Sequence, residues 1–333
     1  MTVRIGVLGV GRIGKMHAEI IATKVPETSL AGVFDVNDAA AQAVSEELRA
    51  PVMMVEEMLA SPDVDAVAVC SSTDTHVDLI ERAAAAGKAI FCEKPVSLDL
   101  SEVDRALAAV DAAGVPFMVG FNRRFDPTHA AVQQAVAQGR VGAPHLARLS
   151  SRDPAPPPIE YIKVSGGIFV DMMIHDFDMA RFVVGSPVTS VYATGAVRID
   201  PAIGEAGDLD TAVVTLTHEN GCITTIDNSR QAVYGYDQRM EVFGSEGMAV
   251  SENPMKNAAM VYSASERQGS VLPYFFLDRY TDSYRIEWED FARYVRDGGP
   301  SPVSGADGRA PVAIGIAAWE SYRTGGRVAV DRG

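Results

Sequence analysis

The segment Gly166–Phe182 carries the acid and base groups best suited to proton transfer. Asp171 and His175 are four residues apart, so on an α-helix they would share one face. A carboxylate beside an imidazole raises the proton affinity of the ring and fixes its orientation, as general base catalysis requires. Asp178 follows three residues after His175 and would lie near the same side. An isolated Asp–His contact on a helix surface has the same spacing, and that alternative stays open.

Lys94 is a second candidate for the chemistry. It lies in the tripeptide Glu93-Lys94-Pro95, directly after the apolar run Ala89–Cys92. If that run is a strand of a parallel sheet, Lys94 lies at its carboxyl end, where doubly wound folds bind ligands. Pro95 favours an extended backbone at Lys94. The ammonium group could then donate to substrate oxygens and stabilise a developing alkoxide. A solvated loop lysine is the alternative.

The beginning of the chain has the pattern of a dinucleotide site. The apolar run Val3–Leu8 leads into GVGRIG, residues 9–14, which fits G-x-G-x-x-G between a strand and a helix. Gly9 would permit the tight turn, Gly11 the approach of a pyrophosphate, and Gly14 the packing of the helix. Asp35 ends the next apolar run about 20 residues after Gly14. A carboxylate there accepts from a ribose 2′-OH and repels a 2′-phosphate, so we predict NAD in preference to NADP.

Two sets of residues follow as binding candidates. We predict that the cofactor is bound by Gly9, Gly11, Arg12, Ile13, Gly14, Asp35, Ser71, Thr73, His76, Glu93 and Lys94. Polar and aromatic groups in the later loops suit a hydroxylated substrate, although each is also common as a loop anchor. The predicted substrate-binding residues are Lys94, Asn122, Arg123, Arg152, Asp153, Asp171, His175, Tyr234 and Tyr236.

The first third of the chain has the alternating pattern that a doubly wound parallel sheet requires. Strands are expected at Val3–Leu8, Leu30–Phe34, Ala66–Cys70, Ala89–Cys92 and Phe117–Val119. Helices are expected at His76–Ala86 and Asp99–Ala113, each followed by a glycine (Gly87, Gly114) in the position of a C-cap. We predict an N-terminal Rossmann domain, residues 1–122, and a second domain, residues 123–333.

The second domain begins with helix and strand patterns and continues as strands without intervening helices. A helix is expected at Thr128–Gln138, a strand at His145–Ser151, and a loop at the proline-rich Asp153–Pro158. Further strands are expected at Thr189–Arg198, Thr211–Thr217, Ile223–Asn228 and Arg239–Phe243, with Asn220-Gly221 as a hairpin signal. Helices at Tyr284–Arg296 and Pro311–Tyr322 would end the chain. The expected fold class is therefore α/β: a Rossmann domain plus an α+β domain with a large, mostly antiparallel, open sheet. No helices are expected over one face of that sheet, which predicts a homotetramer.

Composition excludes several classes of protein. The 333 residues carry a formal net charge of −15 with no basic stripe, which argues against a nucleic-acid partner. No apolar run approaches the roughly 18 residues of a membrane span, and the start has no signal-peptide pattern. Cys70, Cys92 and Cys222 are scattered without C-x-x-C spacing, so we expect buried reduced thiols, no metal site and a cytoplasmic location.

These motifs together resemble the Gfo/Idh/MocA oxidoreductase family. The resemblance rests on GVGRIG, the EKP tripeptide and the Asp-x-x-x-His segment, and it spans essentially the whole chain. The stretches SRDPAPPPIEYIKVSGGIFVDMMIHDFDMARF and NSRQAVYGYDQRMEVFGSEGM are most similar to its inositol-oxidising members. The resemblance implies a catalytic set of Lys94, Asp171 and His175, and NAD-dependent oxidation of myo-inositol to its 2-keto product. Another cyclic polyol or aldose as substrate (scyllo-inositol, glucose), or a non-enzymatic NAD-binding sensor, remains an alternative.

Overall fold

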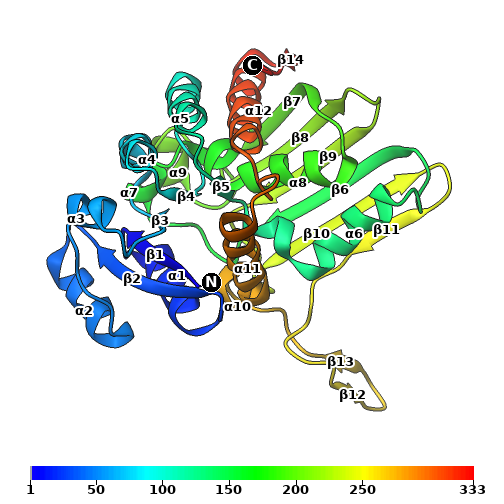
Figure 1. Cartoon of the computed structure of the whole chain (residues 1–333). Coiled ribbons are helices and arrows are strands. Elements are labelled where there is room, and N and C mark those ends of the chain that lie inside the picture. The colour runs from blue at the N-terminus through cyan, green and yellow to red at the C-terminus, as the bar shows by residue number, and fades with distance from the viewer. Residues whose placement is uncertain (1) are drawn as a thin grey trace. The chain divides into compact units, whose positions relative to one another are not determined.

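The early strands form one parallel sheet in the order β2-β1-β3-β4-β5 (Figure 1). The computed structural model describes residues 2–333. The strands are β1 (Val3–Leu8), β2 (Thr28–Phe34), β3 (Ala66–Val69), β4 (Ala89–Glu93) and β5 (Phe117–Gly120). The chain passes from β1 to β2 on one side and places β3 on the other side of β1. At such a reversal, doubly wound folds bind ligands beside the carboxyl ends of the strands.

Helices complete this first unit, which comprises residues up to 125 together with residues 282–312. They are α1 (Arg12–Thr23), α2 (Asp38–Leu48), α3 (Val55–Ala60), α4 (His76–Ala85), α5 (Leu100–Ala113), α11 (Thr281–Asp297) and the start of α12 (Gly305–Thr324). Short 3-10 turns lie at Thr73–Thr75 and Asn122–Phe125. Helix α5 begins at the Asp99 N-cap and ends at Gly114 in the left-handed region, as its capping residues predict.

The second unit, residues 126–281 and 313–333, is built on a seven-stranded sheet in the order β11-β10-β6-β9-β8-β7-β14. Only β6 and β9 pair in parallel, so the sheet is mostly antiparallel, as expected. The strands are β6 (Pro144–Arg152), β7 (Val188–Ala196), β8 (Thr211–His218), β9 (Ile223–Ser229), β10 (Asp237–Gly244), β11 (Met248–Ser251) and β14 (Val328–Ala329). A separate hairpin pairs β12 (Met260–Tyr262) with β13 (Arg267–Gly269).

Helices of the second unit lie against one face of its sheet (Figure 1). They are α6 (Pro127–Ala137), α8 (Ile174–Val184) and the rest of α12. The unit also contains the short helices α7 (Ile159–Ile162), α9 (Pro201–Glu205) and α10 (Phe276–Arg279). Phe177 and Ala180 of α8 and Ile314 of α12 share one core with Leu149 of β6 and Ile226 of β9. Several large apolar side chains on the other face are exposed. The fold class predicted from the sequence is therefore confirmed.

Two features differ from expectation. Helix α12 begins at Gly305, six residues before Pro311, because Ser304 and Asp307 cap each other and Pro311 is tolerated within the helix. Residues 282–312 belong to the first unit, whereas the expected domain boundary assigned them to the second. Cys70, Cys92 and Cys222 are buried free thiols, as expected. In the described part of the chain, no helix has the length and apolar character to cross a membrane.

Candidate active site

The glycine loop after β1 has the shape that a dinucleotide needs. Gly9 adopts φ +93, and a Cβ there would lie 2.6 Å from the backbone of Ser71. A Cβ on Gly14 would lie 1.8 Å from the carbonyl oxygen of Gly9. At Gly11 the same atom would meet nothing within 4 Å. Two glycines therefore permit close packing within the protein, whereas Gly11 leaves open space at the start of α1, where a pyrophosphate could approach the helix N-terminus.

Asp35 is tied to the same loop. Its Oδ2 accepts from the backbone N–H of Val10 at 2.8 Å, and its Oδ1 accepts from that of Asn37 at 2.9 Å. Each carboxylate oxygen keeps a further lone pair that can accept from a ribose hydroxyl. The residues present therefore fit NAD, with the pyrophosphate at Gly11 and the adenine ribose at Asp35.

Hydrogen bonds hold the loop after β3, which lies at the carboxyl end of that strand. Ser71 Oγ lies 2.6 Å from Thr75 Oγ1, and Thr73 begins the 3-10 turn. His76 is buried, with Nδ1 2.9 Å from the carbonyl oxygen of Pro95 and Nε2 3.1 Å from that of Ser71. Burial lowers the pKa of His76 below its ordinary value. His76 thus links the β3 and β4 loops, and cofactor contact by His76, Thr73 and Ser71 stays a prediction.

Lys94 lies directly after β4, as its motif predicts. The Lys94–Pro95 peptide is cis, and Lys94 is partly exposed. Its backbone N–H donates to Glu93 Oε2 at 3.1 Å. The carboxylate of Glu93 also faces His17, with 2.8 Å between Glu93 Oε1 and His17 Nε2. Glu93 is therefore engaged by protein donors on both oxygens.

Asp171 and His175 do not share one α-helix, and in this the sequence prediction is wrong. Residues Ile168–Met172 form a π-helical turn in which Met173 N donates to the carbonyl oxygen of Ile168, and α8 begins only at Ile174. Spacing could not reveal the wider turn because the sequence pattern fits an α-helix equally well. π turns are rare and occur frequently at functional sites. Both residues are partly exposed, whereas Asp176 and Asp178 are buried.

The carboxylate of Asp171 is held by residues that the sequence analysis missed. Tyr161 OH donates to Asp171 Oδ1 at 2.8 Å, and Arg230 Nη1 lies 3.7 Å from Asp171 Oδ2. Arg230 is 1% exposed and also pairs with Asp208, at 3.1 Å between Nη2 and Oδ2. Asp208 in turn accepts from Ile168 N at 2.8 Å, which anchors the π turn. Neither spacing nor a motif marks these partners, apart from the position of Arg230 directly after strand β9.

Asn122 and Arg123 are buried at the end of β5. Asn122 is bound to Ser283 of α11: Ser283 Oγ donates to the carbonyl oxygen of Asn122 at 2.5 Å and accepts from its Nδ2 at 3.3 Å. Neighbouring Arg124 pairs with Asp307 at 3.0 Å. These contacts stabilise the first unit, and a substrate role for Asn122 and Arg123 stays a prediction.

Arg152 and Tyr234 belong to an ion-pair cluster on the open face of the second sheet. Because side chains alternate along a strand, Arg152 faces away from buried Ser151 and the helices above it. Its guanidinium binds Asp227 at 2.5 Å and Tyr234 OH at 3.0 Å. Burial and the adjacent carboxylate of Asp237 raise the pKa of Tyr234, which donates to Asp237 at 2.7 Å. The structure thus groups these two candidates with acidic residues of the open face.

Asp153 and Tyr236 lie next to this cluster in the chain. The backbone N–H of Asp153 donates to Ser229 O at 3.0 Å, and its carbonyl accepts from Ala232 N at 2.6 Å. Tyr236 is buried and packs edge-on against Tyr280, with 6.0 Å between ring centroids. Substrate contact by Asp153 and Tyr236 stays a prediction.

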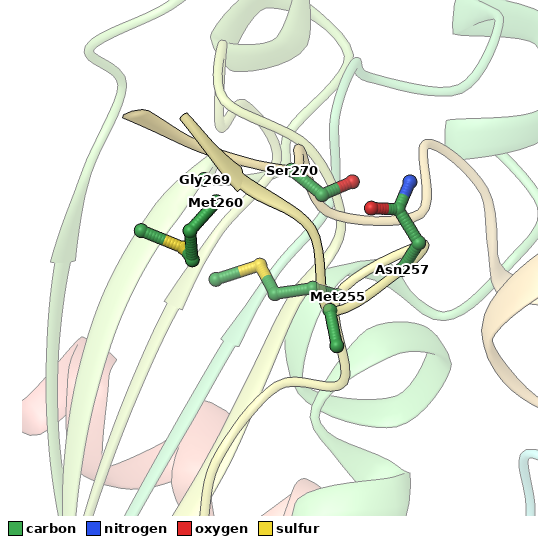
Figure 2. Close-up of a pocket in the computed structure, with 6 residues that line it drawn as sticks. Met255, Asn257, Met260, Gly269 and Ser270 are labelled. Carbon is green, nitrogen blue, oxygen red and sulfur yellow. The ribbon is translucent and has the colours of Figure 1, made fainter. Parts of the chain in front are cut away.

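A surface pocket of the second unit lies elsewhere (Figure 2). It is lined by Met255, Asn257, Ala258, Met260, Gly269 and Ser270, around the β12–β13 hairpin. None of these residues is among the predicted site residues. Over residues 2–333, no group of three His, Cys, Asp or Glu side chains could hold a metal ion.

Known proteins resemble both halves of the chain. Residues 3–121 match the oxidoreductase family with an NAD-binding Rossmann fold, and residues 129–250 match the GFO/IDH/MocA C-terminal domain. A myo-inositol 2-dehydrogenase of Thermotoga maritima is 47% identical over 96% of this chain and 96% of its own length. An inositol 2-dehydrogenase of Rhizobium meliloti is 47% identical over 96% and 97%. The crystal structure of scyllo-inositol dehydrogenase from Lactobacillus casei with NAD(H) and scyllo-inositol superposes with a TM-score of 0.92, at 29% identity over 99% of both chains.

The glycine loop, Asp35 and the matches to both halves define an NAD-dependent oxidoreductase. The chain belongs to the Gfo/Idh/MocA oxidoreductase family.

Proposed function

We propose that the protein oxidises myo-inositol at its axial hydroxyl to the 2-keto product, with NAD as the cofactor. The observation that carries this proposal is the extent of identity to two enzymes named for inositol, 47% over nearly the whole chain. The partly exposed Asp171 and His175 support a site that exchanges a proton with a hydroxyl. NAD, when bound, accepts the hydride from the carbon that carries this hydroxyl.

Lys94, Asp171 and His175 are the proposed catalytic residues. His175 takes the hydroxyl proton, and Asp171 orients the ring and stabilises its charged form. Lys94 donates hydrogen bonds to substrate oxygens and favours the developing alkoxide. The variants in the Discussion test whether His175 or Lys94 accepts the proton directly. Loss of the residue that accepts it should lower kcat more than loss of the other.

Substrate recognition is proposed to involve Asn122, Arg123, Arg152, Asp153, Tyr234 and Tyr236 as well. Inositol stereoisomers differ only in the direction of their hydroxyls, so a small shift of any donor changes the preferred isomer. The second candidate substrate is scyllo-inositol, favoured by the likeness to the Lactobacillus casei enzyme.

Steady-state NADH formation tests this proposal with myo-inositol, scyllo-inositol, other inositol isomers and glucose. We expect the highest kcat/KM for myo-inositol and a kcat lower by about 10²–10⁴-fold in the His175→Ala variant. A higher kcat/KM for glucose than for every inositol would contradict the proposal.

We further propose a homotetramer in the cytoplasm, assembled through the open sheet face of the second unit. Exposed apolar side chains on that face support the assembly, and three free cysteines support a reducing compartment.

A further inference from the structure

A chain of hydrogen bonds in the first unit ends at the backbone of Lys94. Trp288 of α11 donates from Nε1 to Nδ1 of His17 at 2.9 Å. His17 Nε2 lies 2.8 Å from Glu93 Oε1. The other oxygen of Glu93 accepts from Lys94 N at 3.1 Å. Because His17 is on α1, these contacts join the helix of the glycine loop to the Lys94 turn.

The chemistry of the donors fixes the proton position on His17. An indole N–H can only donate, so Nδ1 of His17 must present its lone pair to Trp288. The ring proton therefore lies on Nε2 and is donated to Glu93. The His17 ring is fully buried and is packed edge-on by Phe91, Tyr284 and Trp288 at 5.3 to 5.6 Å between centroids. Packing of this kind holds the ring in one orientation.

Glu287 is a buried carboxyl near Glu93. It precedes Trp288, is fully buried, and neither of its carboxyl oxygens has a hydrogen-bond partner within residues 2–333. Burial, and then the charge of Glu93, raise the pKa of Glu287 well above its ordinary value. Glu93, by contrast, has a partner on each carboxylate oxygen, His17 Nε2 at 2.8 Å and Lys94 N at 3.1 Å.

We propose that Trp288, His17 and Glu93 are positioning residues for Lys94, and that their hydrogen bonds fix the direction in which Lys94 leaves the end of β4. This rests on the proposed function only in that Lys94 contacts the substrate. Glu93 then acts through Lys94 rather than by binding the cofactor. Gly120 of β5 supports the arrangement, because a Cβ there would come within 3.2 Å of Glu93 Oε1.

Replacement of Glu93 by glutamine distinguishes positioning of Lys94 through these hydrogen bonds from a role of Glu93 in packing alone. A carboxylate accepts from both His17 and Lys94, but an amide has one oxygen and one NH2 group. If the oxygen faces His17, the NH2 group meets the Lys94 N–H; if the amide is reversed, it meets the His17 N–H. One donor–donor contact remains in either case while Trp288 fixes the His17 proton on Nε2.

Trp288→Phe releases that restriction. Nδ1 of His17 can then carry the proton, so Nε2 can accept from the amide of Gln while the amide oxygen accepts from Lys94 N. Trp288→Phe should therefore partly restore the kcat that Glu93→Gln lowers.

The experiment compares Glu93→Gln, Trp288→Phe and the double variant, with Glu47→Gln as a matched control on the surface of the same unit. We expect Glu93→Gln to lower kcat by up to about 10²-fold, the cost of a misplaced group. The Kd for NAD, measured by fluorescence titration, should stay within about 3-fold of that of the wild type, because the glycine loop and Asp35 are unchanged. The double variant should have a higher kcat than Glu93→Gln alone, and Glu47→Gln should resemble the wild type.

Two readouts are independent of inositol turnover. The rate of Lys94 acylation, followed by mass spectrometry against the other lysines of the same sample, should change in Glu93→Gln and recover in the double variant. The ring ¹⁵N shifts of His17 in the unmodified protein should show protonation at Nε2, which requires no variant to fold. If the wild type does not oxidise inositol but both readouts are as expected, the proposed function is wrong and the positioning role of Glu93 stands. Three results would overturn the proposal. They are protonation of His17 at Nδ1, a Glu93→Gln variant with the kcat and the Lys94 acylation rate of the wild type, and a double variant in which the two losses simply multiply.

Discussion

We predict that Asp35 sets cofactor choice through its carboxylate, which two backbone N–H groups orient. Asp35→Ser removes the charge that repels a 2′-phosphate and the acceptor for the ribose hydroxyls. We expect kcat/KM for NAD to fall and kcat/KM for NADP to rise. The ratio of the first to the second should fall by about 10-fold or more, the usual effect of losing a hydrogen bond to a charged group. Steady-state assays with both cofactors measure this. A wild-type enzyme that used NADP as well as NAD would refute the role of Asp35.

Lys94, Asp171 and His175 act on one proton transfer in the proposed mechanism. Lys94→Met or His175→Ala should lower kcat by about 10²–10⁴-fold, the usual contribution of a positioned acid–base group. Asp171→Asn should also be severely impaired, because it keeps the shape but removes the charge. NAD binding, followed by fluorescence, should survive in all three, and the losses should not multiply in double variants. Near-normal turnover by folded His175→Ala would leave Lys94 as the base.

Glu287 makes the stability of the protein depend on pH. Its pKa in the folded protein is raised by burial and by Glu93, so the folded state holds the proton more tightly than the unfolded state. The contribution of Glu287 is therefore fully present below the unfolded pKa and is lost as pH rises from about 4.5 toward the folded pKa. Glu287→Gln cannot ionise and escapes this loss.

The free energy of unfolding of Glu287→Gln, relative to that of the wild type, should thus increase as pH rises, by up to about 1.4 kcal/mol per pH unit. Urea denaturation between pH 5 and 8, a window of about three units, measures the difference. Glu47→Gln, on an exposed glutamate, serves as the control and should show no such trend. A constant difference between Glu287→Gln and wild type across this range would show that Glu287 is ionised throughout.

Among the elements, those with regular periodicity and glycine ends were predictable from the sequence. Strand β1 has the predicted bounds, and α5 ends at Gly114 as its C-cap position requires. The positions of the glycine loop after β1 and of Asp35 after β2 also follow from spacing, because both belong to one continuous βαβ segment. The π turn at Ile168–Met172 was not, since it changes hydrogen bonding without interrupting the apolar pattern.

The partners of the site residues were beyond sequence analysis for a different reason. Arg230 meets Asp171 and Asp208, and Trp288 meets His17, through tertiary packing of segments far apart in the chain. No local propensity encodes such pairs.

Arg230 stabilises the π turn as a buried cation between two carboxylates. Arg230→Met would leave Asp171 and Asp208 without it, and removing one partner of a buried pair costs about 3–5 kcal/mol. Arg230→Met/Asp208→Asn should recover part of this loss, because one stranded charge is removed. Urea denaturation measures both. Arg82→Met, in an exposed pair with Glu56 at 2.7 Å, is the control and should cost about 1 kcal/mol or less. Equal costs at the two sites would contradict a structural role for Arg230.

At the scale of the whole molecule, each unit is built from two separate segments of the chain. The first unit takes its last helix from residues 282–297, and α12 continues from one unit into the other between residues 312 and 313. A single boundary near residue 122 describes only the first crossing. Amphipathic patterns do not state which sheet a C-terminal helix covers, so this return of the chain required the structure.

The open face of the second sheet carries a row of exposed apolar side chains. Ile223, Leu146, Phe243 and Met248 are register partners across β9, β6, β10 and β11, and 37–55% of each is exposed. A contiguous apolar row on a sheet face is typical of an interface between subunits. The helices of this unit lie on the other face, so a second copy of the chain is the proposed cover.

We expect light scattering at micromolar concentration to show a tetramer, and Phe243→Asp to shift it toward smaller species. A carboxylate at this position would be buried against apolar side chains in the assembly, at a cost of several kcal/mol that the free subunit does not bear. The control is Ile316→Asp, on α12 over the opposite face, which should keep the wild-type mass. Thermal unfolding of the Phe243→Asp variant separates loss of assembly from loss of fold, because Phe243 is already exposed in the subunit. A monomeric wild type, or a Phe243→Asp variant that remained tetrameric, would rule out assembly through this face.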